Sequence, residues 1–189
     1  GLKAKLERSA DVAAQKAVAA ATSGVDVRVF FLVDRSGSMQ GAIESSKEAL
    51  SRIVAGFPLD KLSVASFDTM GLVHVPKAAN RAAVIHMLSG ITASGGTMHS
   101  AAVRALHQSG VRVPASAKLV VIVVGDEAGE SGADLARMFK QHGYRVDAMA
   151  LLLNVSAVRG RTVQDCAREL GIPFSEVKIE SFNDPYQVP

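Results

Sequence analysis

We predict an α/β fold in which an open, mostly parallel, doubly wound sheet carries one antiparallel edge strand and has helices on both faces. Patterns typical of strands and helices alternate along the 189 residues, and such alternation favours a parallel sheet. The segments 25–33 and 118–124 contain continuous apolar runs, as strands buried on both faces of a parallel sheet do. No linker-like stretch or internal repeat divides the sequence, so we expect one globular unit.

The first elements lie on either side of the strand at 25–33. Residues 2–21 are rich in alanine, have apolar residues at helical spacing and end at Gly24, which predicts a helix. After the strand and a polar turn, apolar residues at helical spacing over 39–55 predict a second helix, which Gly56 closes.

A hairpin and two helices follow in the middle of the chain. Strands are predicted at 61–67 and 72–75, and the turn around 69–71 makes them a hairpin, which places one antiparallel strand at the edge of the sheet. A short helix is predicted over about 79–88. A longer one is predicted over 97–109, where small apolar residues recur at helical spacing.

The last third repeats the strand–helix alternation. Beyond the most apolar strand, a helix is predicted over about 132–142 and a strand over 145–153. The next helix is expected to take Thr162 as its N-cap and to end before Gly171. A final strand near 177–181 precedes a polar tail.

Composition narrows the class of protein. Hydrophobic residues make up 48% and charged residues 21% of the chain, the net charge is +3, and the basic residues are scattered, which argues against nucleic-acid binding. The single cysteine, Cys166, allows no internal disulfide or thiolate cluster and is expected in the core. With no apolar run of ~18 residues and no signal-peptide pattern, we expect a cytoplasmic protein without a membrane span. We expect residues 1–24 to form a helix packed on a single domain over 25–189.

Three polar clusters follow or precede the predicted elements at one edge of the sheet. They are Asp34-Arg-Ser-Gly-Ser38 after the first strand, Gly95-Gly-Thr97 before a helix, and Gly125-Asp-Glu127 after the most apolar strand. Because such sheets bind ligands beyond the carboxyl ends of their strands, we expect these clusters to converge. The candidate metal ligands are Asp34, Ser36, Ser38, Thr97 and Asp126.

Carboxylate and hydroxyl oxygens are hard ligands. They favour Mg²⁺ or Mn²⁺, Ca²⁺ less so, and they do not suit zinc. Because the hydroxyl ligands are uncharged, the positive charge of the ion is only partly neutralised, and the ion retains affinity for one more anionic oxygen. A glutamate or aspartate of a partner protein is expected to fill that position, which makes the site a binding device and not an enzyme.

In this order, Asp34-x-Ser36-x-Ser38, Thr97 and Asp126 resemble the metal-ion-dependent adhesion site of von Willebrand factor A (vWA) domains. The resemblance covers roughly residues 25–181 and implies that these side chains line one cation directly or through water. One departure is Gly125-Asp126-Glu127, where many members of the family have Thr-Asp-Gly.

A narrower resemblance is to the C-terminal A domain of Ro-type RNA-binding proteins. The leading helix, the end of the strand before Glu127 and the tail 184–189 carry it. The helical-repeat ring that binds RNA in those proteins is absent from this sequence, so RNA binding is not implied.

Two other functions stay open. A phosphohydrolase of the haloacid-dehalogenase type also places an aspartate after the first strand, and Asp126 with Glu130 resembles its last motif, but its general acid would fall at Ser36. A scaffold that binds no metal is the other, with Asp34 and Thr97 acting as helix caps.

Residues beside the site are expected to have ordinary roles. Asp68 is interpreted as part of a solvated turn, with the rim of the site as the alternative, and Glu127 and Glu130 as solvated. His99 is two positions from Thr97 in the sequence, so its side chain could contact a partner protein bound at the site.

Overall fold

Six strands form one mixed sheet in the order β3-β2-β1-β4-β5-β6. The computed structural model describes residues 25–35, 51, 58–77, 81–91, 96–125, 129–153 and 160–178. The strands are β1 (Val27–Asp34), β2 (Leu62–Phe67), β3 (Gly71–His74), β4 (Lys118–Val124), β5 (Ala148–Leu153) and β6 (Phe174–Lys178). The helices are the 3₁₀ turn η2 (Leu59–Lys61), α3 (Arg81–Ser89), α4 (His99–Gln108), α5 (Gly132–Gln141) and α6 (Thr162–Leu170).

The connections make the sheet doubly wound. β1 pairs in parallel with β2 on one side and with β4 on the other, β4 with β5 and β5 with β6 are also parallel, and only β2 with β3 is antiparallel among the described pairs. The predicted fold class is therefore confirmed, including its antiparallel edge strand. The chain reverses its direction of winding between β1 and β4, and ligands of such sheets bind at this switch point.

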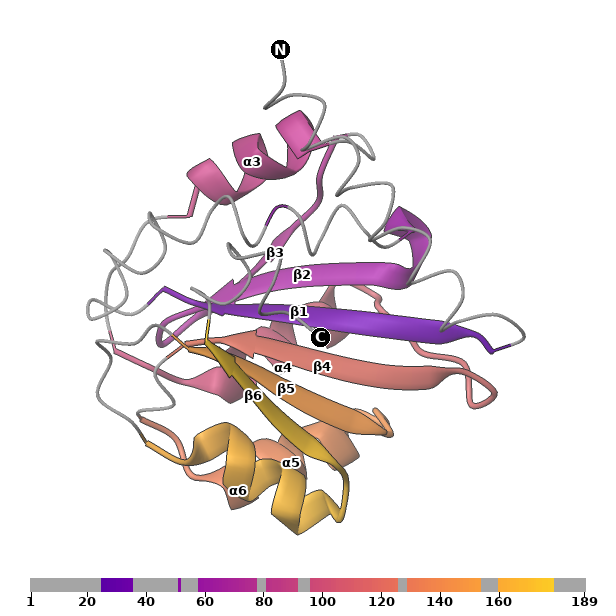
Figure 1. Cartoon of the computed structure of the whole chain (residues 1–189), viewed down its shortest axis with the longest axis vertical. Coiled ribbons are helices and arrows are strands. Elements are labelled where there is room, and N and C mark those ends of the chain that lie inside the picture. Colours follow the sequence, from indigo (N-terminus) through magenta and orange to yellow (C-terminus); the bar gives the residue numbers. More distant parts are fainter. Residues whose placement is uncertain are drawn as a thin grey trace.

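The central strands are buried on both faces. Phe30 and Leu32 of β1 belong to the core cluster on the face covered by α4, α5 and α6, while Phe31 and Val33 alternate with them and are also fully buried. Figure 1 shows α4 behind the sheet and α5 and α6 near the end of the sheet formed by β5 and β6. Phe30 meets Tyr144 edge-to-face, with ring centroids 4.9 Å apart.

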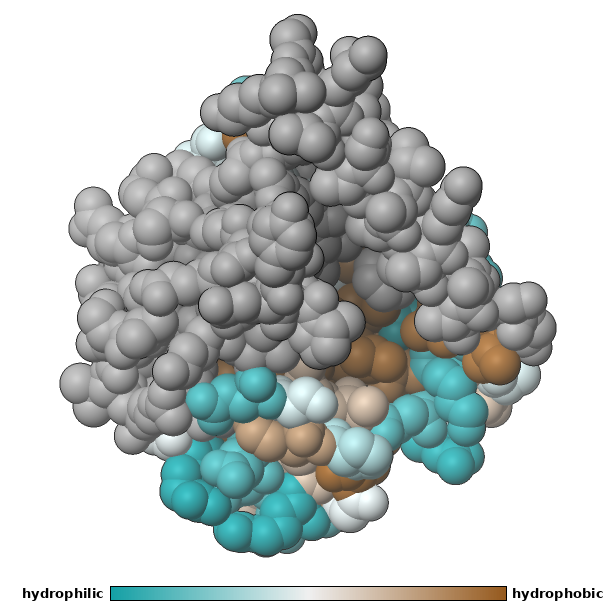
Figure 2. All heavy atoms as spheres, in the orientation of Figure 1, coloured by the Kyte–Doolittle hydropathy of each residue, from teal (hydrophilic) through white to brown (hydrophobic). Residues whose placement is uncertain are grey.

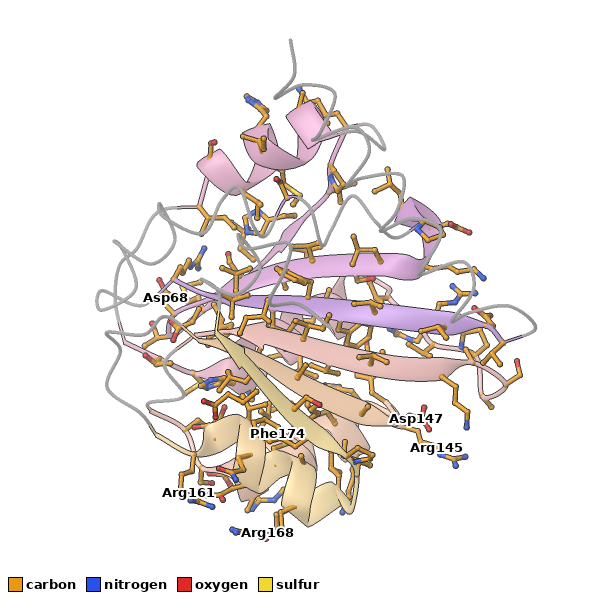
Figure 3. All side chains as sticks on the ribbon, viewed as in Figure 1. Asp68, Arg145, Asp147, Arg161, Arg168 and Phe174 are labelled. Carbon is orange, nitrogen blue, oxygen red and sulfur yellow. The ribbon has the colours of Figure 1, made fainter. Side chains whose placement is uncertain are left out.

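Helix α6 has a buried side and a charged side. Cys166 and Ala167 are buried, and burial raises the pKa of the Cys166 thiol to about 12, so the predicted core role of this cysteine is confirmed and the thiol is unreactive. On the outer side Asp165 pairs with Arg161 and Arg168, whose side chains point away from the sheet in Figure 3. In Figure 2 hydrophilic residues cover this end of the molecule, whereas hydrophobic ones show over the middle strands.

Two details at the end of the chain differ from the sequence prediction. β6 begins at Phe174 instead of 177, because the ladder with β5 starts at Met149 opposite Phe174, and polar residues on this exposed edge strand mask the pattern. The N-cap of α6 is Arg161, and the Thr162 hydroxyl instead donates a hydrogen bond to the carbonyl of Glu130.

Several predicted elements cannot be compared with the structure. The helix at 2–21, the helix at 39–55 except for Ser51, the N-terminal element 1–24 and the tail after 178 lie outside the described residues. Among the helices that the structure does describe, none has the length and apolar character that crossing a bilayer requires.

A stacked histidine pair joins the C-terminal ends of α4 and α5. The rings of His107 and His142 lie 4.2 Å apart. Burial, and then the charges of His107, Arg104 and Arg112, lower the pKa of His142. The folded state therefore binds fewer protons than the unfolded state, whose histidines titrate near pH ~6.5.

We expect neutral His142 to contribute to the stability of the folded state above about pH 6.5. This contribution is lost as the pH falls from there through the lowered pKa of His142. We expect the melting temperature to fall between pH 7.5 and 5.5, and to fall less in His142→Gln. Thermal unfolding followed by circular dichroism at several pH values measures both slopes. Equal slopes in the two proteins would show that His142 does not contribute.

Candidate metal centre

Two of the five predicted ligands, Asp34 and Thr97, lie in the described part of the chain. Asp34 is the last residue of β1 and is fully buried, and Thr97 is half-buried two residues before α4 begins. Ser36, Ser38 and Asp126 lie outside the described residues. The site is therefore built here from the contacts of the first two and of the segments that flank the others.

Asp34 packs directly against the end of β4. Val33 and Val124 are partners in the parallel register, which sets Asp34 beside Gly125. A Cβ atom added to Gly125 would lie 2.9 Å from the Cβ and 3.1 Å from Oδ2 of Asp34. The Asp34 carboxylate thus occupies the space that any other residue at 125 would need.

Thr97 packs against the other end of the same loop. A Cβ added to Gly129 would lie 2.8 Å from the Cβ of Thr97 and 2.5 Å from its carbonyl oxygen, and Gly129 has a φ of 116°. Glycine is required here by both the close approach and the left-handed backbone. The loop after β4 therefore contacts Asp34 where it begins and Thr97 where it ends.

The end of β2 joins these segments. The backbone amide of Arg35 donates to the carbonyl of Phe67 (2.8 Å), and that of Met98 donates to the carbonyl of Asp68 (2.7 Å). Figure 3 labels Asp68 at the edge of the sheet where the parallel strands β1 and β2 end. Segments that follow β1, β2 and β4 and the segment before α4 thus meet at one edge of the sheet.

Asp68 is not part of a solvated turn, and that interpretation is wrong. Its Oδ1 accepts hydrogen bonds from the guanidinium of Arg35 (3.3 Å) and from the amide of Met70 (2.7 Å), and the pair of charged side chains is only 16% and 13% exposed. Arg35 also donates to the Met70 carbonyl (3.2 Å). This network fixes the residue that follows Asp34. The sequence gives no local signal for it, because 33 positions separate Arg35 from Asp68.

A buried serine extends the network toward β3. The Ser66 hydroxyl lies 2.6 Å from Nε2 of His74, and Arg35 donates to the same hydroxyl oxygen (3.4 Å). Burial, and then the charge of Arg35, lower the pKa of His74, which favours a neutral imidazole whose Nε2 can accept a hydrogen bond from the Ser66 hydroxyl. A serine–histidine pair is one form of an activated nucleophile, but Ser66 is fully buried, so the pair is structural.

The Glu130 side chain binds the start of α4. The expectation that it is solvated is therefore wrong. Its carboxylate accepts hydrogen bonds from the amide of Ser100 (2.8 Å) and from the Ser100 hydroxyl (2.5 Å). A negative charge at a helix N-terminus is favourable, and its carbonyl also accepts from Thr162. Glu130 therefore fixes the N-terminal end of α4, the helix that Thr97 precedes by two residues.

Removing the Glu130 carboxylate is expected to lower the free energy of unfolding. Glu130→Ala leaves the buried amide and hydroxyl of Ser100 without their acceptor, which costs about 1–3 kcal/mol. Urea unfolding measures the change, and Glu169→Ala on the exposed side of α6 is the control, expected within about 0.5 kcal/mol of wild type. Equal midpoints for the two variants would contradict the capping role.

His99 is buried and is not available to a partner, contrary to the alternative raised by its position. Its side chain is fully buried, and its ring packs against Phe67 with centroids 4.7 Å apart. The residue anchors the first turn of α4 to β2.

The donor chemistry fits a small, hard cation. Asp34 supplies a buried carboxylate over the cradle that Gly125 leaves open, and Thr97 supplies a hydroxyl at the far end of the same loop. No cluster of three or more histidine, cysteine, aspartate or glutamate side chains occurs among the described residues, so this edge offers no zinc-type set there.

The sequence profile of the von Willebrand factor type A domain family matches residues 29–129, more than half of the chain. The chain belongs to this family. A search of curated protein sequences finds no significant match to this vWA domain.

Solved structures share the vWA fold at low sequence identity. A von Willebrand factor type A protein from Catenulispora acidiphila is 19% identical with a TM-score of 0.60, covering 86% of this chain and 41% of its own. Manganese-loaded TRAP from Plasmodium vivax is 15% identical (TM-score 0.57; 86% and 74% covered). Proximal thread matrix protein 1 from the mussel byssus, with a zinc-occupied MIDAS motif, is 14% identical (0.58; 86% and 43%). The chain thus spans less than half of the first and third of these proteins.

Proposed function

We propose that this vWA domain is a metal-dependent protein-interaction module. One Mg²⁺, or Mn²⁺ and less readily Ca²⁺, is held by Asp34, Ser36, Ser38, Thr97 and Asp126. The ion offers an open position to a glutamate or aspartate of a partner protein, and no catalysis follows. We further propose a helix over 1–24 packed on the domain 25–189, and a cytoplasmic location.

The contact of both described candidate ligands with one loop carries this proposal. Gly125 lies against Asp34 and Gly129 lies against Thr97, so Asp126 belongs to the loop that connects the two. Asp34 is fully buried at the end of β1, and its carboxylate oxygens are the hard ligands that a divalent cation such as Mg²⁺ prefers. The position is also the switch point of the sheet, where ligands of such folds bind.

The metal-loaded structures support the divalent class of ion. One relative of the same fold was crystallised with manganese and another with zinc in a MIDAS motif. For this chain the ligands are all oxygen donors, which favours magnesium or manganese over zinc. The bound ion would supply a Lewis-acidic position for a carboxylate oxygen, while Arg35 and Glu130 hold the flanking segments in place.

The test is a calorimetric titration of Mn²⁺ and Mg²⁺ into wild type, Asp34→Asn and Asp60→Asn. We expect one ion per wild-type chain, a loss of at least about 100-fold in affinity in Asp34→Asn, and no change in Asp60→Asn, because Asp60 is exposed in the turn before β2. Equal binding in Asp34→Asn and wild type would contradict the assignment. An assay with an aryl phosphate and Mg²⁺ is expected to show no turnover, and turnover abolished in Asp34→Asn would make the protein a phosphohydrolase.

A further inference from the structure

Two exposed apolar side chains, those of Met70 and Met98, belong to segments that border the candidate metal centre. Among the described residues, the large hydrophobic side chains that are exposed are those of Val25, Met70, Leu72, Val75 and Met98. Met70 is 70% and Met98 38% exposed, and both belong to segments that border the site. Exposed apolar clusters next to a binding site often contact the ligand.

Both methionines are fixed to the same aspartate. The amide of Met70 donates to Oδ1 of Asp68 (2.7 Å), the amide of Asp68 donates to the carbonyl of Met70 (3.0 Å), and the amide of Met98 donates to the carbonyl of Asp68 (2.7 Å). Their backbones are therefore held side by side, while their side chains reach solvent.

These anchors also tie the methionines to the predicted ligands. Met98 directly follows Thr97, and the carbonyl of Met70 accepts a hydrogen bond from Arg35, which directly follows Asp34. The charge of Arg35 is already paired with Asp68, so it adds little attraction for an anion. The most exposed of the described side chains in this network, those of Met70 and Met98, are therefore apolar.

We infer that Met70 and Met98 form an apolar rim that receives an aliphatic or aromatic side chain of the partner, next to the acidic residue that reaches the ion. This inference rests on the proposed function. Methionine adapts its shape to different apolar groups, so the rim would select for an apolar neighbour of the carboxylate without requiring one residue type. The partner segment it fits is an acidic residue with an apolar residue within two positions.

The test uses a displayed library of random 12-residue peptides, selected on the full chain in Mg²⁺. We expect the selected peptides to combine an acidic residue with an apolar neighbour, and their binding to vanish in chelator. The affinity of one such synthetic peptide is then measured for the Met70→Ser/Met98→Ser variant, expected to fall by about ten-fold or more. Val25→Ser is the matched control, because Val25 is similarly exposed but precedes β1 at the opposite edge, and it is expected to bind as wild type.

Titration of Mn²⁺ into the same variants separates the two proposals. Unchanged Mn²⁺ affinity with lost peptide affinity supports the rim. Acidic peptides without apolar neighbours, bound equally by the double variant, would overturn the rim and leave the metal-dependent module intact. Absence of Mn²⁺ binding in wild type would overturn both. Selection that survives chelator, or self-association of the chain that the double variant abolishes, would also overturn the rim as part of the metal centre.

Discussion

Gly125→Ala is expected to weaken Mn²⁺ binding by about 10- to 100-fold. This is the usual range for changes in the residues that orient a metal ligand without binding the metal themselves. The added methyl group would lie 2.9 Å from the Cβ and 3.1 Å from Oδ2 of Asp34. These separations force the carboxylate away from the end of β4. The backbone at 125 is not in the left-handed region, so the effect comes from the contact with Asp34 and not from backbone strain.

Gly90→Ala is the control for this experiment. An added Cβ there meets its nearest neighbour, the Met87 carbonyl, at 3.4 Å, an ordinary contact, and Gly90 is exposed in the turn that follows α3. Calorimetric titration of Mn²⁺ compares the two variants with wild type. Full Mn²⁺ affinity in Gly125→Ala would mean that Asp34 does not hold the ion in the position described.

Gly71→Ala is expected to cost the largest amount of folding free energy. An added Cβ would lie 2.1 Å from the carbonyl oxygen of Ala101 and 2.8 Å from the Cβ of Ala105, both on α4. The first neighbour is a backbone atom of α4 and cannot rotate away as the end of a side chain could, so β3 would have to separate from α4. Overpacking of this kind costs about 3 kcal/mol, which corresponds to a fall of roughly 6–12 °C in the melting temperature for a chain of this size.

Differential scanning calorimetry of Gly71→Ala and Gly90→Ala measures this difference. Gly90→Ala is expected to melt within about a degree or two of wild type, because surface changes alter stability by about 0.5 kcal/mol or less. If both variants melted together, the close packing of β3 on α4 would not be a feature of the folded protein in solution.

Much of the fold could be predicted because the strongest patterns belong to buried elements. The strand β4 was predicted over 118–124 and has those bounds in the structure, because an apolar run buried on both faces leaves little ambiguity. The antiparallel pairing of β2 with β3 followed from the short turn between them and is confirmed. The edge strand β6 was misplaced, since alternating polar residues and partial exposure weaken its signal.

The place of Asp34 at the end of a buried strand could be predicted from the sequence, and the contacts that hold the neighbouring segments could not. The position of Asp34 after a buried strand follows from a local motif and a general property of parallel sheets. The Arg35–Asp68 pair and the bonds from Glu130 to Ser100 join residues about 30 positions apart, and nothing local marks either of them. Such contacts depend on how the strand ends are brought together, which is information that only the tertiary structure contains.

Asp34, Ser36, Ser38, Thr97 and Asp126 are proposed to share one ion, and crystals grown with Mn²⁺ test this most directly. Anomalous scattering locates the ion independently of the protein atoms. The account predicts one peak at the switch point between β1 and β4, within bonding or water-bridged distance of Asp34, Thr97 and Asp126. A structure in which Asp34 and Asp126 face different surfaces, with no peak between them, would contradict it.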